Sequence, residues 1–80
     1  MTITILGPGC RNCITLEKIT REAIADLGID ADVEKVTDYA AIARYGVMST
    51  PGLVVDGEVV LSGRVPTVAH VRELLAARSA

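Results

Sequence analysis

The fold of this chain is constrained most by a predicted strand at residues 2–6 that is followed closely by a predicted helix at residues 11–27. Residues 2–6 are rich in β-branched side chains, which is typical of a strand, and Gly7-Pro8-Gly9 stops the run. Over residues 11–27, apolar side chains recur at spacings of three and four, which predicts one face of a helix. These side chains belong to Cys13, Leu16, Ile19, Ala23, Ile24 and Leu27. The chain therefore begins as a strand followed directly by a helix.

Three further patterns follow this opening unit. Over residues 29–36, apolar Ile29, Ala31 and Val33 alternate with acidic Asp30, Asp32 and Glu34, which indicates a strand with one wet face at a sheet edge. Asp38 is a suitable N-cap for a short helix over residues 39–45, and Gly46 suits its end. Asp-Gly at residues 56–57 separates two apolar runs, which predicts an antiparallel hairpin.

The last segment predicts a helix capped by Thr67, and the element order then defines the fold class. Its apolar stripe comprises Val68, Val71, Leu74 and Leu75. The order is βαβαββα, which predicts an α/β fold with a four-stranded mixed sheet and helices on both faces. A length of 80 residues allows one modest core, so residues 1–80 are expected to form a single domain.

Polar positions on the helices are expected to face solvent. On the first helix these are Glu17 and Arg21, which can form an i,i+4 ion pair. On the last helix they are Arg72, Glu73 and Arg78.

The composition of the chain argues against nucleic acid and membranes as partners. The chain has no Trp or Phe, two Tyr and a net charge of −2, so it offers neither stacking platforms nor a basic stripe for nucleic acid. The same charge argues against anionic membranes as partners. No signal peptide or membrane-spanning run is visible, so a cytoplasmic location is expected, where CxxC pairs are more often catalytic or metal-binding than structural.

The chemistry of the chain is predicted to reside at Cys10 and Cys13. At a strand end and a helix start, unpaired N–H groups and the helix dipole favour an anion, so Cys10 is predicted to ionise and act as the nucleophile. Arg11 and Asn12, the intervening residues, are expected to tune this thiolate. One helical turn later, Cys13 is placed to act as the resolving thiol. The pattern predicts a thiol/disulfide oxidoreductase.

Metal binding is the main alternative use of the two thiols. A structural zinc site needs four ligands, and the chain supplies two Cys and one His, so no metal and no cofactor are expected and His70 is interpreted as a surface residue. A Cu(I) carrier would hold its metal between two thiolates, but such carriers run βαββαβ. Cu(I) delivery and redox sensing remain the alternative hypotheses.

The loop before the third predicted strand carries Ser49-Thr50-Pro51-Gly52. Proline cannot donate a backbone hydrogen bond to a ladder, so a plain turn is one explanation of Pro51. The other is a functional loop beside the two cysteines.

Together these motifs resemble the small thioredoxin-like proteins often described as redox-active disulfide proteins, between thioredoxins and glutaredoxins. The resemblance covers nearly the whole chain. It rests on residues 7–13, 34–38, 45–51, 55–57 and 62–66. It implies a thioredoxin-like fold, a dithiol/disulfide site at Cys10 and Cys13, and a cis peptide bond between Thr50 and Pro51.

The resemblance also implies the partners of the site, and the chain departs from the pattern of typical thioredoxins in the strand before it. Thr50 and Pro51 are expected to dock an extended segment of a disulfide-bearing protein substrate, with the Thr50 backbone as the contact. An upstream reductant is then required. Typical thioredoxins carry an acid in the strand before the site, whereas residues 2–6 contain none. Proton transfer to the resolving thiol is therefore expected to use water or another group.

Overall fold

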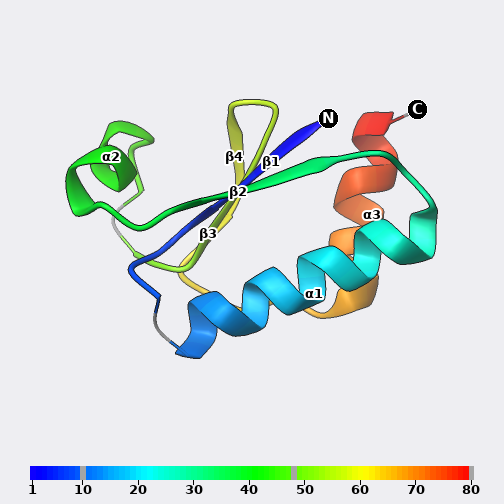
Figure 1. The fold of residues 1–80 in the computed structure, drawn as a ribbon, viewed down its shortest axis with the longest axis horizontal. Coiled ribbons are helices and arrows are strands. Elements are labelled where there is room, and N and C mark those ends of the chain that lie inside the picture. Colours follow the sequence, from blue (N-terminus) through cyan, green and yellow to red (C-terminus); the bar gives the residue numbers. More distant parts are fainter. Residues whose placement is uncertain (10, 48, 80) are drawn as a thin grey trace.

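The computed structural model describes residues 1–9, 11–47 and 49–79. The strands and helices follow one another in the order that the sequence predicts. The long helix α1 runs beneath the sheet (Figure 1). In chain order the elements are β1 (Thr2–Leu6), α1 (Arg11–Leu27), β2 (Asp32–Val36), α2 (Tyr39–Arg44), β3 (Gly52–Val55), β4 (Glu58–Ser62) and α3 (Val68–Ser79). The predicted α/β class and element order are confirmed.

The four strands form one mixed sheet in the order β2-β1-β3-β4. β1 pairs in parallel with β2 and antiparallel with β3, and β3 pairs antiparallel with β4. In the β1–β2 ladder, Ile5 lies opposite Lys35, so both side chains point to the same face. Because β1 is an inner strand, the chain leaves the sheet toward α1 from the middle of the sheet and not from its edge.

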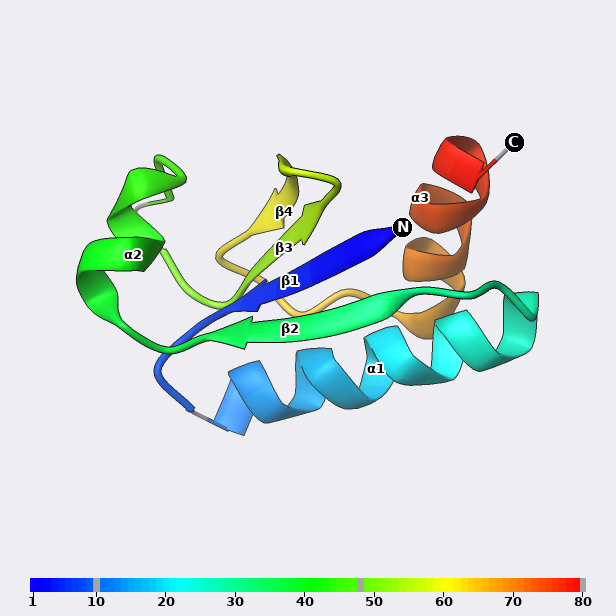
Figure 2. The ribbon, with the colours of Figure 1, turned by 45° about the horizontal axis from the view of Figure 1, so that its top comes forward.

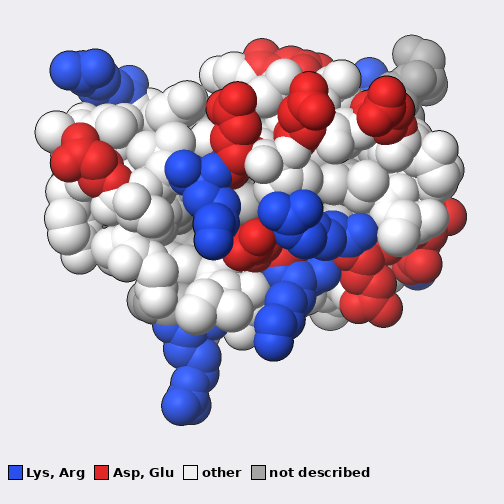
Figure 3. All heavy atoms as spheres, viewed as in Figure 1, with Lys and Arg blue, Asp and Glu red and all other residues white. Residues whose placement is uncertain are grey.

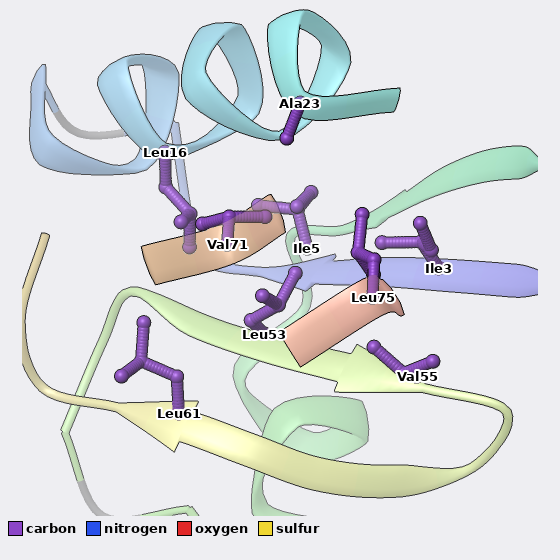
Figure 4. Close-up of a cluster of buried hydrophobic side chains, with 9 residues drawn as sticks. All are labelled: Ile3, Ile5, Leu16, Ala23, Leu53, Val55, Leu61, Val71 and Leu75. Carbon is purple, nitrogen blue, oxygen red and sulfur yellow. The ribbon is translucent and has the colours of Figure 1, made fainter. Parts of the chain in front are cut away.

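Two apolar clusters lie on opposite faces of this sheet, because alternate residues of a strand point in opposite directions. Figure 4 shows the larger one, in which side chains from α1 and α3 meet those of β1, β3 and β4. Its buried members are Ile3, Ile5, Leu16, Ala23, Leu53, Val55, Leu61, Val71 and Leu75. The smaller cluster joins Leu6 and Val54 to Ile42 of α2. Helices therefore cover both faces, as predicted.

Figure 2 shows α3 beside the start of β1, and α2 beyond the end where β1 and β2 finish. The end of β1 at Leu6, after which the two cysteines follow in the sequence, thus lies at the α2 end of the molecule. None of the helices within the described ranges combines the length and apolar character needed to cross a bilayer.

The predicted caps and turn form with the expected partners. Asp38 accepts a hydrogen bond from the Ala41 N–H at 3.1 Å, and Thr67 Oγ1 accepts one from the His70 N–H, also at 3.1 Å. Asp56 and Gly57 both have positive φ, at 50° and 86°, as a two-residue type I′ hairpin turn requires. These local signals were sufficient to locate the element boundaries around them.

The second strand is shorter than predicted. The alternating pattern begins at Ile29, whereas β2 begins at Asp32, which pairs with Thr2. Ile29 and Ala31 still pack against the larger core cluster, which explains their apolar character. The ladder cannot extend to them because β1 itself begins at Thr2, and the Asp32 N–H already bonds the Met1 carbonyl at 3.0 Å.

The polar face of α3 forms two ion pairs that the sequence pattern does not predict. Arg72 forms an ion pair with Asp26 of α1 at 2.8 Å, and Arg78 forms one with Glu58 of β4, also at 2.8 Å. Both pairs join α3 to a neighbouring element. At this exposure each contributes roughly 0–1 kcal/mol.

Candidate active site

The candidate site lies where β1 leaves the sheet and α1 begins. β1 ends at Leu6, and the Gly7 N–H still donates to the Val36 carbonyl at 2.9 Å, so the chain is held to β2 up to that residue. Cys13 lies in the first turn of α1, is 5% exposed and is disulfide-bonded. Cys10, the predicted nucleophile, lies outside the described residues.

Gly7 packs directly against the Cys13 side chain. A Cβ atom at Gly7 would overlap Cys13 Sγ and would lie 3.0 Å from Cys13 Cβ. The same point lies 4.0 Å from Thr50 Cβ. Cys13 and Thr50, two predicted site residues, therefore both border the position that a side chain at Gly7 would occupy.

The loop containing Thr50 and Pro51 is held in place from the end of β4. The Thr50–Pro51 peptide bond is cis, the isomer that the resemblance implied. Pro51 is fully buried, and its carbonyl accepts a hydrogen bond from the Gly63 N–H at 2.9 Å. Gly63 has a φ of +75°, and a Cβ there would lie 3.0 Å from Ser49 Cβ. The close approach of these two segments explains why glycine occupies position 63.

The other predicted site residues are accessible. Arg11 and Asn12 are exposed in the first turn of α1, and Thr50 is half-buried. Among the backbone hydrogen bonds outside helices and strands in the described residues, none involves Thr50. In the same residues, no group of three or more His, Cys, Asp or Glu side chains is placed to hold a metal ion.

One face of α1 differs from the prediction. Glu17 was expected to be solvated, but its side chain is 18% exposed, whereas that of Arg21 is 56% exposed. Glu17 Oε2 accepts from Arg21 Nε at 3.0 Å, and Glu17 Oε1 lies 3.4 Å from Lys35 Nζ on β2. Figure 3 shows acidic and basic side chains side by side on this face of the molecule.

The two cations set the ionisation of Glu17. The hydrogen bond from Arg21 is the largest cause that lowers the pKa of the Glu17 carboxyl, and Lys35 adds to it through a hydrogen bond and its charge. Burial opposes the shift without reversing it. Glu17 is therefore a carboxylate at neutral pH. Sequence analysis identified the Arg21 pair by its spacing, but the Lys35 contact depends on how α1 packs against β2.

Comparison with known proteins gives the family of this chain. Residues 1–76 match the model of a thioredoxin domain. The chain belongs to the thioredoxin family. It is 45% identical over 75 residues to a thioredoxin of Methanothermobacter thermautotrophicus, a match that covers 94% of this chain and 97% of that protein.

A second archaeal thioredoxin, from Methanocaldococcus jannaschii, is 39% identical over 75 residues, which cover 94% of this chain and 86% of that protein. Membership of this family makes the chain a thiol/disulfide oxidoreductase, and proteins of this kind act on disulfide-bearing substrates. The family resemblance drawn from the motifs is thereby confirmed.

Proposed function

We propose that this chain reduces disulfides of protein substrates through a dithiol at Cys10 and Cys13, in a single domain spanning residues 1–80. The observation that carries the proposal is the position of Cys13: disulfide-bonded, 5% exposed, in the first turn of α1 and packed against Gly7. A buried sulfur is protected from substrate but remains able to react within its own chain. This is the property that a resolving thiol needs.

The reaction proceeds by two exchanges. The Cys10 thiolate attacks one sulfur of the substrate disulfide, which forms a mixed disulfide and releases the other substrate sulfur as a thiolate. Cys13 then loses its proton and attacks the Cys10 sulfur, which releases the second substrate thiolate and leaves a Cys10–Cys13 disulfide. The substrate gains two electrons, and an upstream reductant of the cytoplasm returns two electrons to the dithiol.

The surrounding residues have supporting roles in this proposal. Cys10 is activated by its place before α1, with Arg11 and Asn12 beside it. The Thr50 backbone docks an extended substrate segment. Pro51 is buried, so its part is to hold that loop, with its carbonyl bound to the Gly63 N–H, rather than to present its ring to substrate.

Insulin reduction in the presence of dithiothreitol tests the proposal. Cys10→Ser is expected to lower the rate to that of dithiothreitol alone. Cys13→Ser is expected to capture substrate as a mixed disulfide, visible on non-reducing electrophoresis and released by reductant, whereas a Cys10→Ser/Cys13→Ser chain captures nothing. Undiminished turnover by Cys10→Ser would overturn the assignment.

Two further measurements separate the alternatives. Alkylation of reduced Cys10 should reach its maximal rate well below pH 8.5, about where an ordinary thiol is half ionised. A Cu(I) titration against a thiol chelator tests the carrier hypothesis. Tight Cu(I) binding by a chain that fails to reduce insulin would replace the proposed reaction with metal delivery.

A further inference from the structure

A small cavity lies beside Cys13, between α1 and the sheet. Its volume is about 40 Å³, enough for one or two water molecules. The residues that line it include Ile5, Gly7, Cys13, Glu17 and Lys35. Three of them titrate, namely Cys13, Glu17 and Lys35. The buried cysteine thus lines the same cavity as both members of an ion pair.

The sequence explains how these groups meet. Glu17 follows Cys13 by four residues on α1, so the two side chains lie on neighbouring positions of one helix face. Lys35 pairs with Ile5 in the β1–β2 ladder and therefore points to the face that α1 covers. Its ammonium reaches Glu17 Oε1 at 3.4 Å. The other carboxylate oxygen is held by Arg21, which does not line the cavity.

These charges act on Cys13 once its disulfide is reduced. A nearby carboxylate disfavours the thiolate form of a cysteine, and a nearby ammonium favours it. Lys35 and Arg21 are 57% and 56% exposed, whereas Glu17 is 18% exposed, so solvent weakens the field of each cation more than that of the carboxylate. The carboxylate should therefore have the larger influence on the buried sulfur.

We propose that Glu17 is a positioning residue for the redox reaction, whose carboxylate beside the cavity keeps the reduced Cys13 sulfur protonated until the mixed disulfide has formed. The inference rests on the proposed function, in which Cys13 is the resolving thiol. A protonated Cys13 does not compete with the Cys10 thiolate as nucleophile, and water in the cavity provides a path for its proton when the mixed disulfide has formed.

The test follows the titration of Cys13 alone, in the reduced Cys10→Ser chain, through the ¹³C chemical shift of Cys13 Cβ. Replacing Glu17 by Gln should lower the pKa of Cys13 by about one unit, a tenfold change in the thiolate-to-thiol ratio. Lys35→Gln should move the pKa in the opposite direction and by less. Glu17→Asp keeps the charge and should leave the value nearer to that of the parent.

Glu22→Gln is the matched control, because Glu22 lies on the same helix, is exposed and does not line the cavity. It should leave the Cys13 titration unchanged. If Glu17→Gln does not fold, as judged by far-UV circular dichroism, Lys35→Gln carries the test. The inference is wrong if neither cavity variant shifts the titration, or if Glu22→Gln shifts it equally.

Insulin reduction distinguishes this failure from failure of the proposed function. Turnover that needs both cysteines, combined with an unmoved titration, removes the role of Glu17 and leaves the oxidoreductase mechanism intact. Turnover that survives Cys10→Ser removes the proposed mechanism, whatever the titration of Cys13.

Discussion

The sulfur of Cys13 occupies the space into which a side chain at Gly7 would extend. Gly7 is buried and does not have a positive φ, so glycine is required there by packing against the cysteine rather than by backbone conformation. We therefore expect Gly7→Ala to destabilise the oxidised protein by about 1–3 kcal/mol, the usual cost of overpacking a well-filled site. Urea unfolding under non-reducing conditions measures this change.

A double-mutant cycle shows whether the sulfur is responsible. In a Cys13→Ala background the overlapping atom is absent, so the cost of Gly7→Ala should fall by more than half. An equal cost in both backgrounds would assign the effect to the Cβ atom of residue 13, which alanine retains, rather than to the sulfur.

Alanine substitutions at Gly63 and Gly57 distinguish the cost of a positive φ from an effect on the proposed docking loop at Thr50 and Pro51. Both have positive φ, at 75° and 86°, so alanine should cost each roughly 1–2 kcal/mol. A Cβ at Gly57 meets no atom within 4 Å, whereas one at Gly63 lies 3.0 Å from Ser49 Cβ. We expect Gly63→Ala to lower kcat/KM for insulin reduction several-fold. Gly57→Ala, with a similar loss of stability, should retain the parent kcat/KM, and equal losses of activity would contradict the docking role of the loop.

Asp56 fastens the β3–β4 hairpin to the start of β1. Its N–H donates to the Thr2 carbonyl and its carboxylate accepts from the Thr2 N–H, both at 2.8 Å. Asp56→Ala loses the side-chain acceptor and places alanine at a positive φ, so the free energy of unfolding should fall by about 1–2 kcal/mol. Asp56→Asn keeps an acceptor and a residue that tolerates this conformation, and should cost less than half as much. Thermal unfolding of the two variants gives the comparison.

The sequence was sufficient for features whose signal is local. The bounds of α1 follow from the spacing of its apolar residues, and the hairpin turn follows from Asp56-Gly57, because both depend on neighbours in the chain. The length of β2 could not be predicted, since it is set by where β1 begins. Gly7 was interpreted as the end of a strand, and its contact with Cys13 depends on how α1 leaves the sheet.

The same distinction applies to the candidate site. Motifs and resemblance were sufficient to identify Cys13, Thr50 and Pro51. That Glu17 and Lys35 line the same cavity as Cys13 depends on how α1 packs on β2. Glu17 was expected to face solvent, because nothing in residues 11–27 alone indicates which residue of a later strand will lie opposite it.

The ion pairs of Glu17 should make the stability of this protein depend on acid. Because Arg21 and Lys35 lower the pKa of Glu17 in the folded chain, the carboxylate stabilises the fold above its unfolded pKa, about 4.3. This contribution disappears as the pH falls through the folded value. With both cations more than half exposed, we expect Glu17→Gln to cost about 0.5–1 kcal/mol at pH 7, or roughly 2–8 °C in Tm.

Thermal unfolding of the parent and Glu17→Gln chains from pH 7 to pH 3 checks this expectation. The difference in Tm should be constant down to about pH 5 and should then shrink, because below the folded pKa the parent carries a neutral side chain at position 17 as well. Glu22→Gln, whose residue forms no ion pair within the described parts of the chain, should track the parent over the whole range. A difference in Tm that persists unchanged at pH 3 would show that Gln is poorly accommodated at position 17 for reasons of packing, and that the ion pairs contribute nothing measurable to folding.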